Sequence, residues 1–204
     1  MLPRKSMKKF SEIFCDMDEV LADFIGAACK AHGVTRQELE RKRKPGDWNV
    51  NEALGIGDEE FWRPINGLGE RFWTKIEPLP WCITFYASLF TYAENVIVLS
   101  SPSEHPGCYS GKYTWIRKIL GPKVKFCPFS EKQLFSKPNR ILIDDRELNL
   151  SKWLDFEDSG DVVLFPSQGN RLHSLAEFPT DYVYKKLEGM LKAVNKATFP
   201  FPRD

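Results

Sequence analysis

Two aspartates placed two residues apart, Asp16 and Asp18, are the first side chains in this sequence that could do covalent chemistry. Asp16 ends residues 10–16, a stretch typical of a β-strand, and an apolar helical pattern follows over residues 20–32. Just past a strand end, the backbone can aim Asp16 at a ligand and bring Asp18 beside it. One carboxylate could then act as a nucleophile while the other protonates a leaving oxygen. A solvated acidic turn is the alternative interpretation.

A second acidic pair, Asp144 and Asp145, ends the apolar run of residues 140–143. Two adjacent carboxylates at the end of a buried strand are costly unless they are paired or bound to a metal. Together with Asp16 they offer the hard oxygen ligands that Mg²⁺ prefers. The pair therefore indicates a magnesium site.

Hydroxyl and ammonium groups that suit phosphate oxygens lie near two further strand ends. Ser100 and Ser101 follow the apolar run of residues 95–99, where hydroxyls and backbone N–H groups can hold a phosphate. A lysine between two later strands would offset repulsion between a phosphoryl group and the carboxylates. Lys132 and Lys137 are the two candidates. Taken alone, the serines could form a polar turn and either lysine could be solvated surface.

The elements around these residues alternate, which predicts an α/β fold with a mainly parallel sheet. Ligands of such sheets bind beyond the carboxyl ends of the strands, where Asp16, Ser100 and Asp144 are expected. The expected strands span residues 10–16, 95–100, 124–127, 140–143 and 161–165. The expected helices of this part span residues 81–93, 109–120, 131–135, 146–157 and 181–194.

The stretch between the first two strands has a different composition. A helix that begins after Thr35 carries a basic run, Arg41 to Lys44, which we expect to be a solvated face or a region that steers anions. Residues 45–78 are rich in Gly, Pro and Trp, with a short helix near residues 58–66. Phe24 and Trp62 belong to an aromatic cluster that could stack a nucleobase or simply pack a core. The other members of this cluster are Phe61, Phe72 and Trp73.

In this order and context, the motifs resemble those of the haloacid dehalogenase-like (HAD) phosphohydrolases. The likeness is closest to the 5′(3′)-deoxyribonucleotidases. It covers residues 10–180 and rests on residues 16–24, 77–80, 100–102, 112–115, 142–146 and 171–174. Two positions depart from that branch. Glu19 stands where those enzymes usually carry glycine, and Glu104 stands near a position that tends to be basic.

The resemblance implies a Rossmann-like core, residues 1–23 and 79–204, with a helical cap inserted at residues 24–78. It implies that Asp16 is the nucleophile and Asp18 the general acid/base, with Ser100 and a lysine holding the phosphate. Lys132 is the first choice for that lysine, because residues 132–136 resemble the family's segment, and Lys137 is the reserve. Mg²⁺ would be bound by Asp16, Asp144, Asp145 and the backbone carbonyl of Asp18. The expected substrate-binding residues are Phe24, Trp62, Ser101 and Arg146.

Composition limits the partners and the compartment. Among the 204 residues, Lys and Arg number 29 and Asp and Glu 28, which disfavours a nucleic-acid coat or a polybasic membrane binder. No apolar run is long enough for a membrane span, and no hydrophobic signal segment follows the basic N-terminus. Five scattered cysteines, none in a CxxC pair, indicate reduced thiols in a cytoplasmic protein.

The leading hypothesis is a Mg²⁺-dependent phosphomonoesterase that acts on a small, nucleotide-like phosphate through an aspartyl-phosphate. One alternative is a HAD phosphatase for a non-nucleotide metabolite. Another is a module on a HAD scaffold that binds nucleic-acid ends or a protein, for which residues 36–44 and the aromatic cluster would be the support. Base, sugar, phosphate position and oligomeric state stay open.

Overall fold

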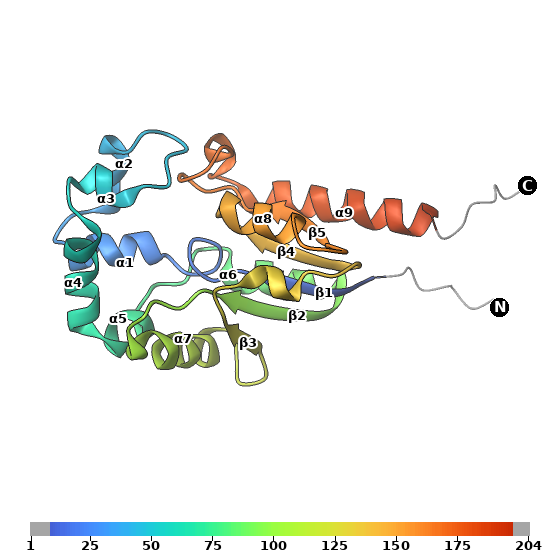
Figure 1. The fold of residues 1–204 in the computed structure, drawn as a ribbon, viewed down its shortest axis with the longest axis horizontal. Coiled ribbons are helices and arrows are strands. Elements are labelled where there is room, and N and C mark those ends of the chain that lie inside the picture. Colours follow the sequence, from blue (N-terminus) through green and yellow to red (C-terminus); the bar gives the residue numbers. More distant parts are fainter. Residues whose placement is uncertain (1–8, 198–204) are drawn as a thin grey trace, which may run out of the picture.

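A five-stranded parallel sheet forms the centre of the computed structural model, which describes residues 9–197 (Figure 1). The strand order is β3-β2-β1-β4-β5, so the connections lead outward on both sides of β1. This arrangement confirms the predicted α/β fold with a parallel sheet. The strands are β1 (Phe10–Cys15), β2 (Ala93–Ser100), β3 (Lys125–Pro128), β4 (Arg140–Asp144) and β5 (Asp161–Leu164).

The sheet is apolar on both faces because successive side chains of a strand point to opposite sides. Ile13 and Cys15 of β1 join the larger core cluster, whereas Phe14 between them joins the smaller one. Ile143 and Leu142 of β4 divide in the same way. Buried near-continuous apolar strands of this kind are what the sequence pattern predicted.

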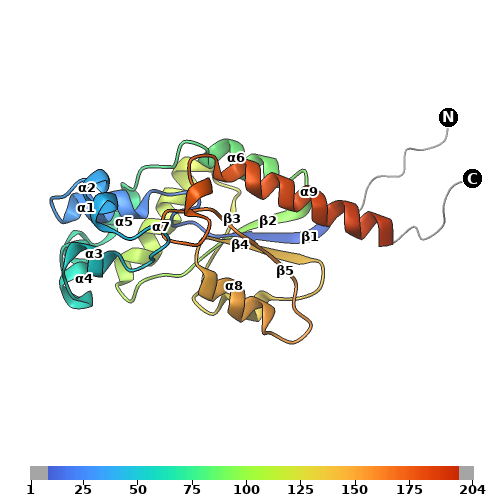
Figure 2. The ribbon, with the colours of Figure 1, turned by 90° about the horizontal axis from the view of Figure 1, so that it is seen from above.

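Helices cover both faces of the sheet, as Figure 2 shows. The larger cluster lies under α6 (Cys82–Leu89), α7 (Pro106–Ile119) and α9 (Pro179–Ala197). The smaller cluster lies under α8 (Glu147–Leu154) and the 3₁₀ turn η1 (Lys132–Phe135), with a second 3₁₀ turn, η2 (His173–Leu175), before α9. None of the helices described over residues 9–197 is long and apolar enough to span a membrane.

The segment between β1 and α6 forms helices that lie beyond the carboxyl ends of the strands (Figure 1). We call these the cap helices: α1 (Phe24–Ala31), α2 (Arg36–Lys42), α3 (Val50–Leu54), α4 (Asp58–Leu68) and α5 (Glu70–Thr74). Three of their buried residues, Ile25, Cys29 and Leu39, form a small cluster of their own. That residues 24–78 act as a separate cap domain stays a prediction.

The cap helices differ from the sequence expectation mainly at their ends. The helix expected over residues 20–32 begins only at Phe24, because the amides of Leu21 and Ala22 both bond to the carbonyl of Met17 in a tight loop. The Asp23 side chain then caps α1 by accepting from the Gly26 amide. The helix expected to begin after Thr35 is present as α2, and a capping box of Thr35 and Glu38 fixes its start. The short helices α3 and α5 were not predicted.

Candidate active site

The strand order brings three polar strand ends to one edge of the sheet. β1 pairs with β2 on one side and with β4 on the other, and the Asp16 amide donates to the Ile143 carbonyl at 2.9 Å. Asp16, Ser100 and Asp144 therefore follow or end neighbouring parallel strands at their carboxyl ends. This is the point where the connections diverge, which is the usual ligand position in open α/β sheets.

Lys132 connects the two acidic motifs. Its Nζ lies 2.6 Å from Asp16 Oδ1 and 2.6 Å from Asp144 Oδ2, and its side chain is 2% exposed. Burial disfavours the charged ammonium, but Asp144 and Asp16 outweigh it and raise the pKa of Lys132. Lys137, the reserve candidate, is exposed instead. The geometry thus places Lys132, and not Lys137, among the carboxylates.

Asp144 and Asp145 are both buried but have different partners. Asp144 accepts from the Arg146 amide and from the Asn149 side chain, and burial raises its pKa to about 6. Both carboxylate oxygens of Asp145 are buried without a hydrogen-bond partner among the described residues. Burial and then the neighbouring Asp144 raise the pKa of Asp145 well above its usual range. A buried, unpaired carboxylate costs several kcal/mol, a cost that either a proton or a bound cation would remove.

Asp16, Asp144 and Asp145 can each offer one oxygen such that all three oxygens lie within 4.8 Å of one another. That donor set, with the two orphaned oxygens of Asp145, fits a hard divalent cation such as Mg²⁺. The residues of the predicted metal site are therefore brought together, and they are compatible with the metal that was expected.

Asp18 faces the cleft from the loop after β1 and contacts a second buried lysine. Lys112 of α7 is fully buried, and its Nζ lies 2.5 Å from Asp18 Oδ2 and 2.8 Å from Ser100 Oγ. Burial raises the pKa of Asp18, and Lys112 opposes this effect only in part. A carboxyl whose pKa is raised in this way is better suited to donate a proton than an ordinary aspartate.

The serines of the second motif lie at different depths. Ser100 is fully buried and contacts the site through Lys112, whereas Ser101 lines the cleft. The Lys112 ammonium also lies 4.9 Å from the ring centre of Trp73, within reach of a cation–π contact. The pair of serines thus provides one internal hydroxyl and one that faces the cleft.

A cleft of about 650 Å³ opens between these residues and the cap helices. Phe24 and Trp62 line it, as predicted, and their rings lie 6.1 Å apart. Trp73 also lines it but is 2% exposed and stacks on Phe24 at 5.7 Å. Arg146 also lines it, and its guanidinium lies 5.5 Å from the ring centre of Trp48. The cleft therefore combines carboxylates and cations with aromatic rings.

Sequence reasoning missed Lys112, Asn149 and Trp48 as site residues. A signal existed for Lys112, because it shares the buried face of α7 with Cys108, Gly111, Trp115 and Ile116 at helical spacing. A lysine in such a face requires an internal partner. The other two residues carry no comparable signal, since a polar position on α8 and a Trp in a loop are common without any function.

The basic run of the cap divides into two kinds of residue. Arg41, Lys42 and Lys44 are exposed, as expected of a solvated face. Arg43 has a side chain only 1% exposed and pairs with Glu40 at 2.7 Å. The expectation of a uniformly solvated face is therefore wrong at Arg43, because Arg43 points inward against the core.

A search of protein-family models matches residues 10–179 to the family described as 5′ nucleotidase, deoxy (pyrimidine), cytosolic type C protein. The chain belongs to this family. It is accordingly a HAD-like enzyme of the phosphatase class, which confirms the resemblance found in the motifs. A search of curated proteins found no match.

Solved structures with a similar fold support the HAD-like assignment at the level of the fold. A phosphonoacetaldehyde hydrolase-like protein from Oleispira antarctica matches with a TM-score of 0.50 and 11% identity, over 100% of both chains. A hydrolase from Streptococcus pneumoniae TIGR4 matches with a TM-score of 0.50 and 13% identity, over 82% of this chain and 99% of its own. At such identities the likeness concerns the fold alone.

Proposed function

We propose that this protein is a Mg²⁺-dependent phosphomonoesterase that hydrolyses a nucleotide-like phosphate through an aspartyl-phosphate on Asp16. The observation that carries the proposal is that Asp16 and Asp18 pair with different neighbours. Asp16 accepts from Lys132, whereas Asp18, whose pKa burial raises, accepts from Lys112. Two carboxylates in different environments can take the separate roles of nucleophile and proton donor.

The reaction then follows from the positions of these groups. A carboxylate oxygen of Asp16 attacks phosphorus, and the bond from phosphorus to the leaving oxygen breaks as Asp18 donates its proton to that oxygen. Asp18 next takes a proton from water, which attacks phosphorus and releases Asp16 and inorganic phosphate. Lys132 and Lys112 offset charge at the phosphoryl group, while Ser101 can bind one of its oxygens.

Charge balance supports the metal requirement. With Asp18 holding the proton that it donates, three ionised carboxylates, Asp16, Asp144 and Asp145, face two ammonium groups, Lys112 and Lys132, which leaves one formal negative charge. A bound Mg²⁺ would be held by Asp16, Asp144, Asp145 and the Asp18 carbonyl, and it supplies charge neutralisation for an incoming phosphate. Without it, the site would repel its substrate.

The aromatic lining of the cleft favours a nucleotide over a small aliphatic phosphate. Phe24 and Trp62 offer apolar ring surface to a planar base, and Arg146 lines the same cleft beside Trp48. The matched family, whose description names a pyrimidine deoxynucleotidase of the cytosol, supports the same substrate class and a cytoplasmic location. Arg36 and Arg43 are engaged in ion pairs within the cap, so the exposed cations of the basic stretch that a nucleic-acid-binding module could use are Arg41, Lys42 and Lys44.

Hydrolysis of para-nitrophenyl phosphate with and without Mg²⁺ tests the reaction, and a panel of phosphates tests the substrate class. We expect turnover that depends on Mg²⁺ and a higher kcat/KM for nucleoside monophosphates than for sugar phosphates. Asp16→Asn should lower kcat by at least about 10³-fold because the amide is nearly isosteric but a poor nucleophile. Asp155→Asn, at the exposed acid that follows α8, is the control.

Three results would contradict parts of the proposal. Activity of Asp16→Asn within tenfold of wild type would exclude Asp16 as the nucleophile. Full activity in the presence of a chelator would exclude the metal. A preference for sugar phosphates would leave a HAD phosphatase for a non-nucleotide metabolite.

A further inference from the structure

Glu19 occupies an unfavourable backbone conformation in the loop that carries Asp18. Its φ angle is +58°, in the left-handed region that is strained for residues other than glycine. Its side chain is 4% exposed, so its carboxylate is removed from water as well. Both features persist only if neighbouring groups hold the residue in place.

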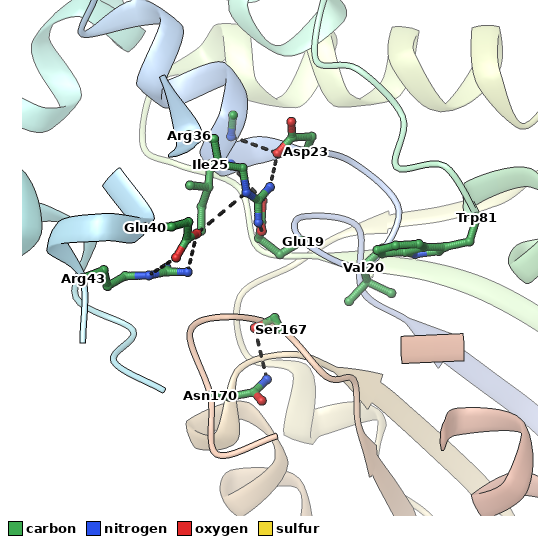
Figure 3. A network of polar contacts seen from close by, with 11 residues as sticks. Glu19, Val20, Asp23, Ile25, Arg36, Glu40, Arg43, Trp81, Ser167 and Asn170 are labelled. Atoms are coloured by element: carbon green, nitrogen blue, oxygen red, sulfur yellow. Dashed lines mark hydrogen bonds and ion pairs between the residues drawn. The ribbon is translucent and has the colours of Figure 1, made fainter. Parts of the chain in front are cut away.

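Cap helix α2 supplies the strongest of these contacts (Figure 3). Arg36 Nη2 lies 2.6 Å from Glu19 Oε2, and the same guanidinium contacts Asp23 through Nη1. The amide of Ile25 donates to Glu19 Oε1 at 2.9 Å. One arginine therefore ties the residue after Asp18 to the residue that caps α1, so that both ends of the loop are fixed to a single planar group.

The loop is held from the core side as well. The indole Nε1 of Trp81 donates to the Val20 carbonyl at 2.9 Å, and the Glu19 amide donates to the Ala22 carbonyl at 2.8 Å. These contacts orient the loop backbone, but they leave the Glu19 carboxylate without a counter-charge. Among the described residues, Arg36 is the cation that pairs with it.

Polar side chains on the same face of α2 also lead to the loop that contains Gly169 and Asn170. Arg36 Nε lies 3.8 Å from Glu40, which pairs with Arg43. Arg43 abuts the loop at Gly169, where an added Cβ would lie 3.5 Å from Nη1. Asn170 in that loop donates to the Asp145 carbonyl at 2.8 Å. The polar face of α2 thus spans from the loop of Asp18 to the loop that supports Asp145.

We propose that Arg36 is a positioning residue for the reaction, acting through Glu19 to hold the strained loop that presents Asp18. This inference rests on the proposed phosphatase function. The ion pair fixes the left-handed turn at Glu19, and the turn sets where the Asp18 carboxyl lies relative to Lys112 and the cleft. Arg36 does not line the cleft, so its effect is expected in kcat rather than in phosphate binding.

Arg36→Gln, made in the wild type and in a Glu19→Gly background, tests this proposal. In the wild-type background, Arg36→Gln should lower kcat for para-nitrophenyl phosphate by about 10- to 100-fold, with KM changed less than about threefold. Glycine adopts a positive φ without strain, so the loop of Glu19→Gly no longer depends on the guanidinium. In the Glu19→Gly background, Arg36→Gln should therefore lower kcat by less than about threefold. Arg41→Gln, an exposed residue on the same helix, should behave as wild type.

A second readout does not depend on activity. Amide hydrogen exchange in a peptide spanning residues 17–24 should be faster in Arg36→Gln than in wild type and unchanged in Arg41→Gln. Equal kcat losses in both backgrounds, or a lower Tm with unchanged kcat and unchanged exchange, would overturn the inference. If the wild type does not hydrolyse para-nitrophenyl phosphate with Mg²⁺, the proposed function fails. The exchange result then decides this inference by itself, with unchanged exchange overturning it.

Discussion

At the scale of single residues, the two adjacent acids of β4 and its loop have opposite effects on the metal-free protein. Asp144 is paired with Lys132 at 2.6 Å, whereas both oxygens of Asp145 are buried without partners. Asp145→Asn removes an uncompensated charge and should stabilise the metal-free protein by about 1 kcal/mol. Asp144→Asn breaks a buried ion pair and should destabilise it by about 3 kcal/mol.

The pH dependence of this difference has a definite sign. Burial and Asp144 raise the pKa of Asp145 in the folded state, so the folded state binds more protons than the unfolded state above the ordinary pKa of about 4. Stability contributed by this group therefore falls as pH rises. The advantage of Asp145→Asn over wild type should grow from pH 4 towards pH 8, measured by urea unfolding with chelator present.

Added Mg²⁺ provides the control for that experiment. It should stabilise wild type in proportion to the logarithm of its concentration and have less effect on either variant. If Asp145→Asn unfolds at a clearly lower urea concentration than wild type at pH 8 without metal, then Asp145 is a structural residue and the metal site is assigned wrongly.

The aromatic residues of the cleft also separate at this scale. Trp62 is half-buried and lines the cleft, so Trp62→Ala should raise KM for nucleoside monophosphates by about 10- to 100-fold, since stacking is worth about 1–3 kcal/mol per base. KM for para-nitrophenyl phosphate should hardly change. Trp73 is buried and stacked on Phe24, so Trp73→Ala should chiefly lower Tm. Equal losses on both substrates for Trp62→Ala would leave a phosphatase without a base site.

Prediction from sequence succeeded for residues whose position depends on a strand end. Asp16, Ser100 and Asp144 could be placed because parallel strands end at one edge, and the structure brings them together there. Lys132 could be chosen only by resemblance, and Lys112 was missed, because a lysine side chain reaches its partners across elements that the sequence does not pair. Asp18 and Lys112 are 94 residues apart in the chain.

At the scale of elements, the contact between α5 and α7 depends on glycine. A Cβ added at Gly111 would lie 2.5 Å from the Cβ of Trp73 and 2.9 Å from the Glu70 carbonyl oxygen. Gly111→Ala should therefore push the two helices apart and destabilise the protein by about 1–3 kcal/mol. Because Lys112 and Trp73 both contact the site, kcat should fall as well.

A glycine without neighbours provides the matched control. Gly67 lies in α4, and nothing lies within 4 Å of its added Cβ. Gly67→Ala should stabilise the protein by about 0.5–1 kcal/mol, because alanine loses less backbone entropy in a helix. Thermal unfolding of the two variants side by side checks both signs. A Gly111→Ala protein as stable as wild type would contradict the tight contact.

Prediction of secondary structure from the sequence was least successful in the cap helices, because these helices depend on tertiary contacts. The core strands and the helices that cover them could be predicted from the periodicity of their apolar residues, because those residues are the buried ones. The short helices α3 and α5 span five residues each and have little periodicity of their own. They form because their aromatic and aliphatic side chains pack on α1, α4 and α7, which is information about tertiary contacts rather than local pattern.

At the scale of the whole molecule, the reactivity of the five cysteines reports on whether the cap helices open independently of the core. Among the described residues no cysteine forms a disulfide, and four of the five are buried. Cys29 belongs to the small cluster of the cap helices, whereas Cys15, Cys82 and Cys108 belong to the main core cluster. Burial raises the pKa of Cys29 to about 11 and that of Cys82 to about 12, so neither reacts until its surroundings open.

If residues 24–78 form a separate cap domain, Cys29 should become reactive before the core thiols do. Cys29 lies in a cluster of only three buried residues, whereas Phe61, Ile65 and Phe72 of the cap helices belong to the main core cluster. Local opening around Cys29 should therefore cost less free energy than global unfolding. In urea below the main transition, iodoacetamide should label Cys29 at least about tenfold faster than Cys82, as measured by peptide mass spectrometry. Labelling in full denaturant, where both thiols are exposed, corrects for intrinsic reactivity. Labelling of both at the single rate of global unfolding would show instead that cap helices and core open as one cooperative unit.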